Sequence, residues 1–263
     1  RTILKMKKFD KLNKKFLKSG YLIEKVENKK ALKYINNLIK NKLCNLLKLK
    51  NPKKFSINNI HNIIKQSDLN LIRVKLINYL NNDKKFREQY FEIAKNILFS
   101  IVGNELAMQN NVNLSIQIPN DESSLLPLHS DTWSGDSPFE IVVWLPLVDC
   151  YKTKSMFILK QKQNEKFRKF FSNKNLNFSS QLHKKFKKDL IFLKINYGEF
   201  LLFNQNLPHG NVINITKETR LSLNCRFKGL FTPYAQKKLG SFFSPLIVRP
   251  ASKIGLNYKF PGE

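Results

Sequence analysis

The sequence lacks several features that would place it in common protein classes. It has three cysteines, Cys44, Cys150 and Cys225, which are too few and too widely spaced for a disulfide framework or a zinc cluster. No apolar run approaches the ~20 residues that a membrane-spanning helix needs. The first residues also lack the apolar segment of a signal peptide. Together these absences favour a protein of a reducing compartment, and we expect a cytoplasmic location.

Acidic residues are scarce as well. The chain has 19 Asp and Glu against 47 Lys and Arg, which gives a net charge of +28. Such an excess is compatible with nucleic-acid binding, because basic side chains neutralise phosphates. However, only seven of the 47 basic residues are arginine, the residue whose bidentate geometry favours base recognition. We therefore favour a solvated basic surface over a nucleic-acid partner.

The length of 263 residues and the 42% hydrophobic content suffice for one sizeable core, so we expect a single domain over residues 1–263. Its first part, residues 1–110, predicts a helical flank. Residues 111–230 predict a β core that contains a basic insertion, residues 160–189. Residues 231–263 then form a C-terminal extension, and the sequence leaves the oligomeric state open.

Apolar residues recur at helical spacing in three stretches of the N-terminal part. These stretches predict helices over 32–46, 69–80 and 86–101, and Gly103 stands where a helix C-cap belongs. A short extended piece is expected around residues 20–24. We read the apolar stripes as core contacts and find no candidate chemistry in the first 110 residues.

From Val112 onward the period of the apolar residues changes to two, which indicates strands. Eight short strands separated by turn residues predict a double-sheet jelly roll, buttressed by the N-terminal helices. The fold class is therefore mainly β with a helical flank (α+β). The predicted strands are 112–118, 128–133, 139–147, 155–159, 190–195, 199–204, 210–215 and 219–227.

The candidate chemistry begins in the predicted strand that reads Leu-His-Ser-Asp-Thr-Trp, residues 128–133. Side chains on a strand alternate between faces, so His129 and Asp131 would point to the same side, about 7 Å apart. A second histidine, His209, follows the apolar stretch 199–204. Two histidines and a carboxylate that leave three metal positions open form the ligand set of non-haem Fe(II) oxygenases. A bidentate 2-oxo acid can take two open positions and O2 the third.

A later strand has one polar and one apolar side, as expected for a barrel wall that faces a polar cavity. The guanidinium of its first residue, Arg220, offers a planar fork of donors that matches a carboxylate, and Ser222 faces the same way. The polar set is Arg220, Ser222, Asn224 and Arg226, and the apolar set is Leu221, Leu223, Cys225 and Phe227.

The order of these residues, His-x-Asp, a distant His and an Arg eleven positions later, resembles the Fe(II)/2-oxoglutarate-dependent oxygenase superfamily. The resemblance implies a double-stranded β-helix fold that binds Fe(II) and uses 2-oxoglutarate and O2 as co-substrates. In it, Arg220 and Ser222 look like the Arg-x-Ser pair that binds the distal carboxylate of 2-oxoglutarate. Gln117 and Trp144 fall on neighbouring strands, at positions that relatives use near the 2-oxo acid.

Residues 126–150 resemble a smaller group, the oxygenases of sporadic carbohydrate-biosynthesis clusters, which are distant relatives of phytanoyl-CoA dioxygenase. This resemblance covers most of residues 110–260. It implies hydroxylation of a small molecule, an anionic carbohydrate such as a sugar or nucleotide-sugar. The presence of Asp131 disfavours the halogenase variant, in which a small residue replaces the carboxylate.

Substrate contacts are expected from four residues: Trp133, Asp136, Trp144 and Arg226. Trp133 would share the inward face of the metal ligands and serve as a sugar platform, or simply pack in the core. Asp136 would bind hydroxyl groups or cap a turn. Arg226 is an alternative clamp for a carboxylate.

The basic insertion, residues 160–189, holds nine lysines and Arg168. Insertions of this length in a compact fold are often functional, so it is either a basic lid over the cavity or a solvated helical surface. Two other functions remain open: a 2-oxoglutarate oxygenase directed at nucleic acid, and a non-catalytic jelly-roll binding module. An intact Arg220 and Ser222 argue against the second, since a mere metal site needs no carboxylate clamp.

Overall fold

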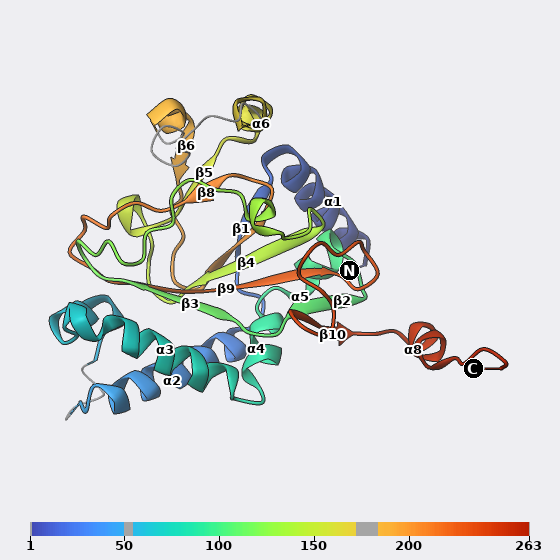
Figure 1. Cartoon of the computed structure of the whole chain (residues 1–263), viewed down its shortest axis with the longest axis horizontal. Helices are drawn as coiled ribbons and strands as arrows, with labels where there is room; N and C mark the ends of the chain where they lie inside the picture. Colours follow the sequence, from blue (N-terminus) through green and yellow to red (C-terminus); the bar gives the residue numbers. More distant parts are fainter. Residues whose placement is uncertain (1, 50–54, 172–183, 263) are drawn as a thin grey trace.

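The computed structural model describes residues 2–49, 55–171 and 184–262. Helices take up the N-terminal part, and strands most of the remainder (Figure 1). The helices are α1 (Thr2–Ser19), α2 (Lys29–Leu46), α3 (Leu69–Asn81), α4 (Phe86–Glu92), α5 (Lys95–Ile101), α6 (Asn164–Phe171) and α8 (Pro250–Asn257). None of these helices combines the length and the apolar character needed to span a membrane.

The strands form two antiparallel sheets of seven and three strands. The large sheet has the order β1-β7-β4-β9-β2-β10, and β3 also pairs with β9. The long strand β9 contacts β4 along one edge, while β3 and β2 pair in turn with its other edge. The small sheet has the order β6-β5-β8. The strands of the large sheet are β1 (Tyr21–Lys25), β2 (Leu106–Gln109), β3 (Asn113–Gln117), β4 (Glu140–Pro146), β7 (Glu199–Asn204), β9 (Arg220–Gly229) and β10 (Phe243–Ile247), and those of the small sheet are β5 (Phe157–Leu159), β6 (Leu190–Phe192) and β8 (His209–Gly210).

The elements form layers, with α2, α3 and α4 on one side of the large sheet and the small sheet on the other (Figure 1). Apolar faces of the helices and the sheet share one core, in which Ile35, Leu76, Tyr90 and Val143 are fully buried. The hydroxyl of Tyr90 donates to the Val143 carbonyl at 2.8 Å and so fixes α4 against β4. The helical layer therefore supports the sheet from the side opposite the small sheet, as the amphipathic pattern predicted.

The helical predictions are confirmed for α2 and α3 but are wrong at two places. The expected helix over 86–101 is two helices, because the carboxylate of Glu27 accepts the backbone N–H groups of Asn96 and Ile97 and starts α5 anew. The helix α1 was not predicted. Its apolar residues Phe9 and Leu12 lie between the lysine pairs 7–8 and 14–15, which masked their helical spacing.

Among the strands, β3, β4, β5, β6, β7 and β9 follow the predicted segments, and two predictions are wrong. Residues 128–133 are not a strand, because a 3-10 helix begins at Asp131 (Asp131–Ser134). Residues 210–215 contribute only the end of β8. Two strands were missed: β2 is buried on both faces and so does not alternate, and β10 contains Pro245 at the edge of the sheet.

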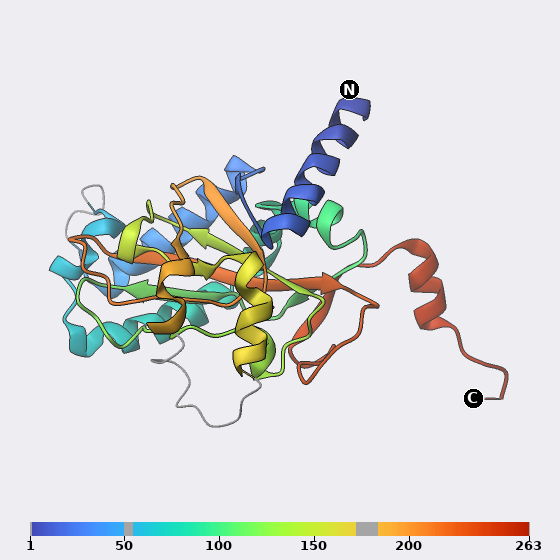
Figure 2. The same ribbon diagram turned by 90° about the horizontal axis from the view of Figure 1, so that it is seen from above.

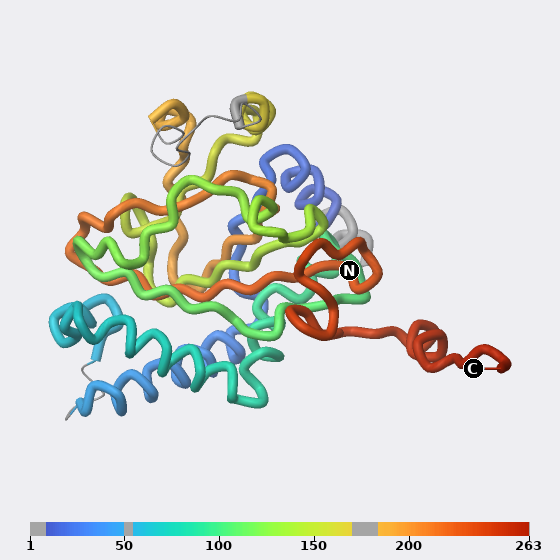
Figure 3. Tube along the Cα trace, in the orientation of Figure 1, coloured from blue at the N-terminus to red at the C-terminus, as the bar shows by residue number. Residues whose placement is uncertain are grey.

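The segment after β9 first contacts the loop that holds Gly135 and Asp136, then forms β10 at the edge of the large sheet, and finally leaves the body of the protein. The helix α8 and the residues that follow extend away from the sheets (Figures 2 and 3). None of the residues of α8 is buried, so this end of the extension adds nothing to the core.

Candidate metal centre

The two histidines of the predicted site are neighbours in a β-bridge. His129 and His209 exchange backbone hydrogen bonds, with N···O distances of 2.9 and 2.8 Å. Because β8 also pairs with β5, the bridge adds His129 to the edge of the small sheet, beside His209. Backbone pairing therefore sets the distance between the two imidazoles, whose ring centres are 4.4 Å apart.

Each imidazole is oriented by its own chain. The Nδ1 atom of His129 lies 2.7 Å from the Pro127 carbonyl, and that of His209 lies 2.9 Å from the Leu207 carbonyl. A carbonyl oxygen only accepts, so Nδ1 carries a proton in both rings, and Nε2 is the nitrogen that faces Asp131 and can bind a metal. This is the orientation that metal-binding histidines adopt when a second hydrogen bond fixes the ring.

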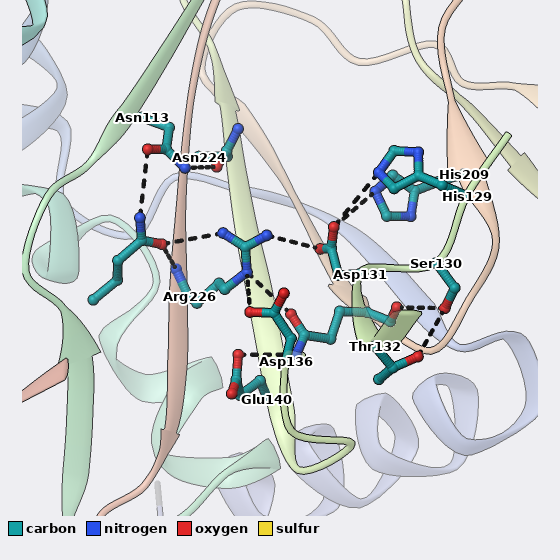
Figure 4. A network of polar contacts seen from close by, with 12 residues as sticks. Asn113, His129, Ser130, Asp131, Thr132, Asp136, Glu140, His209, Asn224 and Arg226 are labelled. Atoms are coloured by element: carbon teal, nitrogen blue, oxygen red, sulfur yellow. Dashed lines mark hydrogen bonds and ion pairs between the residues drawn. The ribbon is translucent and has the colours of Figure 1, made fainter. Parts of the chain in front are cut away.

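Asp131 completes the group from the start of its 3-10 helix. Its Oδ1 atom lies 3.5 Å from Nε2 of His129 and 3.9 Å from Nε2 of His209 (Figure 4). The backbone N–H of Asp131 and the hydroxyl of Ser130 both donate to the carbonyl of Gln205, which anchors this turn next to His209. The three candidate ligand atoms lie within 4.8 Å of one another, and no other such group occurs in the described residues.

The protonation states suit a cation. Burial lowers the pKa of His209 to about 4, so its ring is neutral at neutral pH. Burial alone would raise the pKa of Asp131, but the hydrogen bond with His129 and the charge of Arg226 outweigh it and hold this pKa far below its usual range. Burial lowers the pKa of His129, whereas its hydrogen bonds with Asp131 and with the Pro127 carbonyl raise it. The net effect is a raised pKa. The site therefore presents one carboxylate and at least one neutral imidazole to a metal.

A cavity of about 240 Å³ extends from the three ligands along the large sheet. The alternation predicted for β9 is confirmed: Leu221, Leu223, Cys225 and Phe227 are fully buried, and three of the four polar residues of this strand line the cavity, namely Arg220, Asn224 and Arg226. The strands of the sheet contribute Asn113, Ser115, Val142, Trp144, Arg220, Asn224 and Arg226 to the lining.

Arg220 stands in this cavity as a buried cation without an acid. It is 4% exposed, and its Nη2 donates to the hydroxyl of Ser115 at 3.2 Å. Its Nε and the hydroxyl of Ser222 have no hydrogen-bond partner among the described residues. Burial lowers the pKa of Arg220 to about 10. Buried donors in native proteins are normally satisfied, so these two fit a site for an anion such as a carboxylate.

Two further residues expected near the 2-oxo acid lie differently. Trp144 is 6% exposed and lines the cavity. Gln117 faces Arg220 in the pairing of β3 with β9, but its amide donates to the Val212 carbonyl at 2.8 Å, and it is not part of the lining. Its oxygen has no partner among the described residues.

Trp133 does not share the inward face of the ligands, because the 3-10 helix turns it away from the direction that a strand would give it. Its ring stacks on Phe167 of α6, with centroids 5.3 Å apart and an interplanar angle of 10°. Trp133 is 38% exposed and lines an outer cavity that also reaches His129 and Asp131. The insertion is thereby packed against the entrance of the site, although its residues 172–183 lie outside the described part of the chain.

The expected substrate contacts Asp136 and Arg226 are engaged within the protein. The side chain of Asp136 is fully buried, and its Oδ2 lies 2.6 Å from Nζ of Lys237. Arg226 approaches Asp131 with Nη2 at 3.3 Å and Asp136 with Nε at 3.1 Å (Figure 4). The Asp136 carboxylate is thus already paired with two cations, and its expected role in binding hydroxyl groups stays a prediction.

Two residues that contact the site, Gln205 and Lys237, were not predicted from the sequence. Gln205 holds the metal-ligand turn through its carbonyl, and its side chain contacts Arg226 and Glu140. Gln205 lies in the turn between β7 and His209, so only its closeness in sequence to a predicted ligand could have pointed to it. Lys237 follows β9 in a segment without periodic pattern, and only the folded chain brings it to the site.

No protein-family model matches the sequence, and no curated protein matches it. Solved structures do match. The non-heme monooxygenase ThoJ in complex with nickel is 14% identical with a TM-score of 0.58, over 90% of this chain and 83% of that one. AviO1 from Streptomyces viridochromogenes Tue57 is 11% identical with a TM-score of 0.50, over 84% and 94%. EvdMO1 is 10% identical with a TM-score of 0.55, over 84% and 50%. These likenesses confirm the expected jelly-roll fold.

Proposed function

We propose that this chain is an Fe(II)- and 2-oxoglutarate-dependent oxygenase that acts on a small molecule. The observation that carries the proposal is one cavity lined by two complementary groups. The candidate ligand atoms of His129, Asp131 and His209 lie within 4.8 Å of one another, and Arg220 is buried in the same lining without an acid. A protein that only bound a metal, or a jelly roll that only bound a ligand, would not need both.

The residues divide the work between them. His129, Asp131 and His209 would hold iron through two imidazole nitrogens and one carboxylate oxygen, which leaves three positions for ligands. Bound iron with 2-oxoglutarate and O2 supplies an oxidant for C–H bonds, with succinate and CO2 as the products of the co-substrate.

The remaining contribution of the protein is orientation and exclusion of water. Arg220 and Ser222 would bind the distal carboxylate of 2-oxoglutarate with the two groups that now lack partners. The walls of the cavity, including the buried Trp144, limit the access of water to the reacting groups.

We further propose that the substrate is an anionic carbohydrate derivative. Trp133 is half-exposed at the entrance, and aromatic rings are common platforms for sugars. Phe186 packs on Phe167, which stacks on Trp133, and four exposed lysines flank Phe186 in the sequence, which supports a basic surface near the entrance. Lysines attract a phosphate group without fixing its geometry. The four lysines that flank Phe186 are Lys184, Lys185, Lys187 and Lys188.

The test combines metal binding with turnover. The protein kept free of O2 should bind one Fe(II) by calorimetry. Once O2 is admitted, the Fe(II)-loaded protein should form succinate from 2-oxoglutarate in assays over a panel of sugars, nucleotide-sugars and oligonucleotides. His129→Ala and Asp131→Asn should lose both properties, because an open three-ligand site has little redundancy. His61→Gln is the matched control, since His61 contacts Thr219 and no metal ligand. Wild-type protein without Fe(II) binding, or turnover that persists in both variants, would overturn the proposal.

A further inference from the structure

The two oxygens of the Asp131 carboxylate have different neighbours. Oδ1 faces both imidazoles, at 3.5 Å from His129 and 3.9 Å from His209. Oδ2 faces the opposite way and lies 3.3 Å from Nη2 of Arg226 (Figure 4). One oxygen is therefore directed toward the point where a metal would lie, and a cation holds the other away from it.

Arg226 is itself held on every side of its guanidinium. The N–H of Nε is directed at the amide oxygen of Gln205, at 3.2 Å, and Nη1 lies 3.4 Å from the amide oxygen of Gln109. Asp136 lies 3.1 Å from Nε as an ion pair, without a hydrogen bond of its own to this group. The arginine side chain is 13% exposed, so little water competes for these contacts.

Asp136 in turn is fixed by the segment that follows β9. Lys237 contacts its Oδ2 at 2.6 Å. The backbone N–H of Gln236 donates to the Gly135 carbonyl at 3.1 Å. Gly135 has a φ of +82°, and a Cβ at this position would collide with the side chain of Gln236. The loop before Asp136 and the segment around Lys237 are therefore in close contact.

We propose that Arg226 is a positioning residue that keeps Asp131 a one-oxygen ligand, and that Asp136 and Lys237 hold Arg226 in that place. The inference rests on the proposed function. A carboxylate that binds a metal with both oxygens takes one more coordination position, and only three are open for 2-oxoglutarate and O2. By retaining Oδ2, Arg226 preserves all three. The two carboxylates and the two cations also balance in charge, so the site does not gain net charge from this network.

Cobalt(II) is the probe, because its visible absorption changes with the number of ligands and needs no turnover. Wild-type protein loaded with Co(II) is titrated with 2-oxoglutarate, and the same is done with Arg226→Met and Arg226→Lys. Arg226→Met should change the Co(II) spectrum before 2-oxoglutarate is added, and should weaken 2-oxoglutarate binding by about 10-fold or more, the effect of losing an outer partner of a ligand. Arg226→Lys should recover part of both, because it keeps a cation near Oδ2.

Smaller changes guard against a variant that fails to fold. Asp136→Asn keeps the shape of the side chain but removes the negative charge that holds Arg226. It should shift the spectrum in the same direction by a smaller amount. Lys237→Met should do likewise, whereas Lys238→Met, its exposed neighbour, should match wild type.

Unchanged spectra and 2-oxoglutarate affinity in Arg226→Met and Asp136→Asn would overturn the inference, even if the variants melted at lower temperature. In that case the network only supports the fold. If wild-type protein binds Co(II) but not 2-oxoglutarate, the proposed function fails instead, so the two failures are distinguishable.

Discussion

Replacing Arg220 by Met should affect stability and co-substrate binding in opposite directions. In the free protein Arg220 is a buried cation whose one described side-chain hydrogen bond goes to a neutral hydroxyl, that of Ser115. No carboxylate lies within ion-pair distance of it in the described residues. Removing such a group removes a desolvation cost, so the free energy of unfolding should not fall. Removing a group that supports the fold would instead lower the free energy of unfolding.

The magnitude follows from the pKa. Burial lowers the pKa of Arg220 from 12.5 to about 10. At about 1.4 kcal/mol for each tenfold change in the proton equilibrium, the charged form is disfavoured by on the order of 3 kcal/mol relative to the unfolded chain. This cost is present at every pH below about 10, because the group is protonated in both states there. Packing lost with the longer side chain offsets part of it, so Arg220→Met should be neutral or stabilising by up to about 3 kcal/mol.

The assay is chemical denaturation in two forms of the protein. The metal-free form reports the stability of the fold, and the metal-loaded form, measured with and without 2-oxoglutarate, reports binding of the co-substrate. The denaturation midpoint of metal-free Arg220→Met should be equal to or higher than that of wild type, and the variant should lose the stabilisation by 2-oxoglutarate. Arg220→Lys should weaken 2-oxoglutarate binding at least ~10-fold, since it keeps the charge but loses the fork.

Arg73 provides the matched control, because it is also largely buried but pairs with Asp121 at 2.9 Å. Arg73→Met leaves that carboxylate buried without its partner, so it should destabilise the protein, by about 3–5 kcal/mol if the pair behaves as a fully buried one. If Arg220→Met destabilised the protein as much as Arg73→Met does, Arg220 would be a structural residue. The reasoning from its unsatisfied donors would then be refuted.

Two other predictions concern the edges of the site. Burial raises the pKa of Glu140 to about 7 from 4.5, so the folded protein binds this proton more tightly than the unfolded chain. Its free energy of unfolding should therefore decrease as the pH rises from 4.5 to about 7, and Glu140→Gln should flatten this part of the curve in denaturation series; an unchanged slope would contradict the assignment. Neutralising Lys184, Lys185, Lys187 and Lys188 together should raise the KM for an anionic sugar in a salt-dependent way and leave that for 2-oxoglutarate nearly unchanged. Wild-type kinetics of this variant at every ionic strength would exclude a basic lid.

The sequence predicted the parts of the site that depend on local pattern. The alternation of β9 placed Arg220 and Arg226 on the cavity side because a strand has a period of two. The pairing of His129 with Asp131 was predicted for a reason that proved wrong, since the structure brings them together through a 3-10 turn and not a strand. That difference matters for Trp133, whose direction depends on the geometry after Asp131.

The unpredicted parts depend on contacts between distant segments. The direction of Asp136 follows from its neighbours Arg226 and Lys237, which arrive from β9 and from the extension after it. Nothing in the local sequence around Asp136 distinguishes a residue that binds hydroxyl groups from one that binds two cations. The same holds for Gln205, whose carbonyl and side chain act on different partners.

The bridge between His129 and His209 has a consequence for how the metal and the fold depend on each other. Joining two segments ~80 residues apart costs about 4 kcal/mol of chain entropy, from the logarithmic dependence on loop length. Here the sheet meets that cost through backbone hydrogen bonds and buried side chains, before any ion is bound. The protein should therefore stay folded when a chelator strips the site, unlike small zinc domains whose ligands meet only around the ion. The candidate metal site would then be preformed in the folded protein, and different divalent ions should exchange there without refolding of the chain.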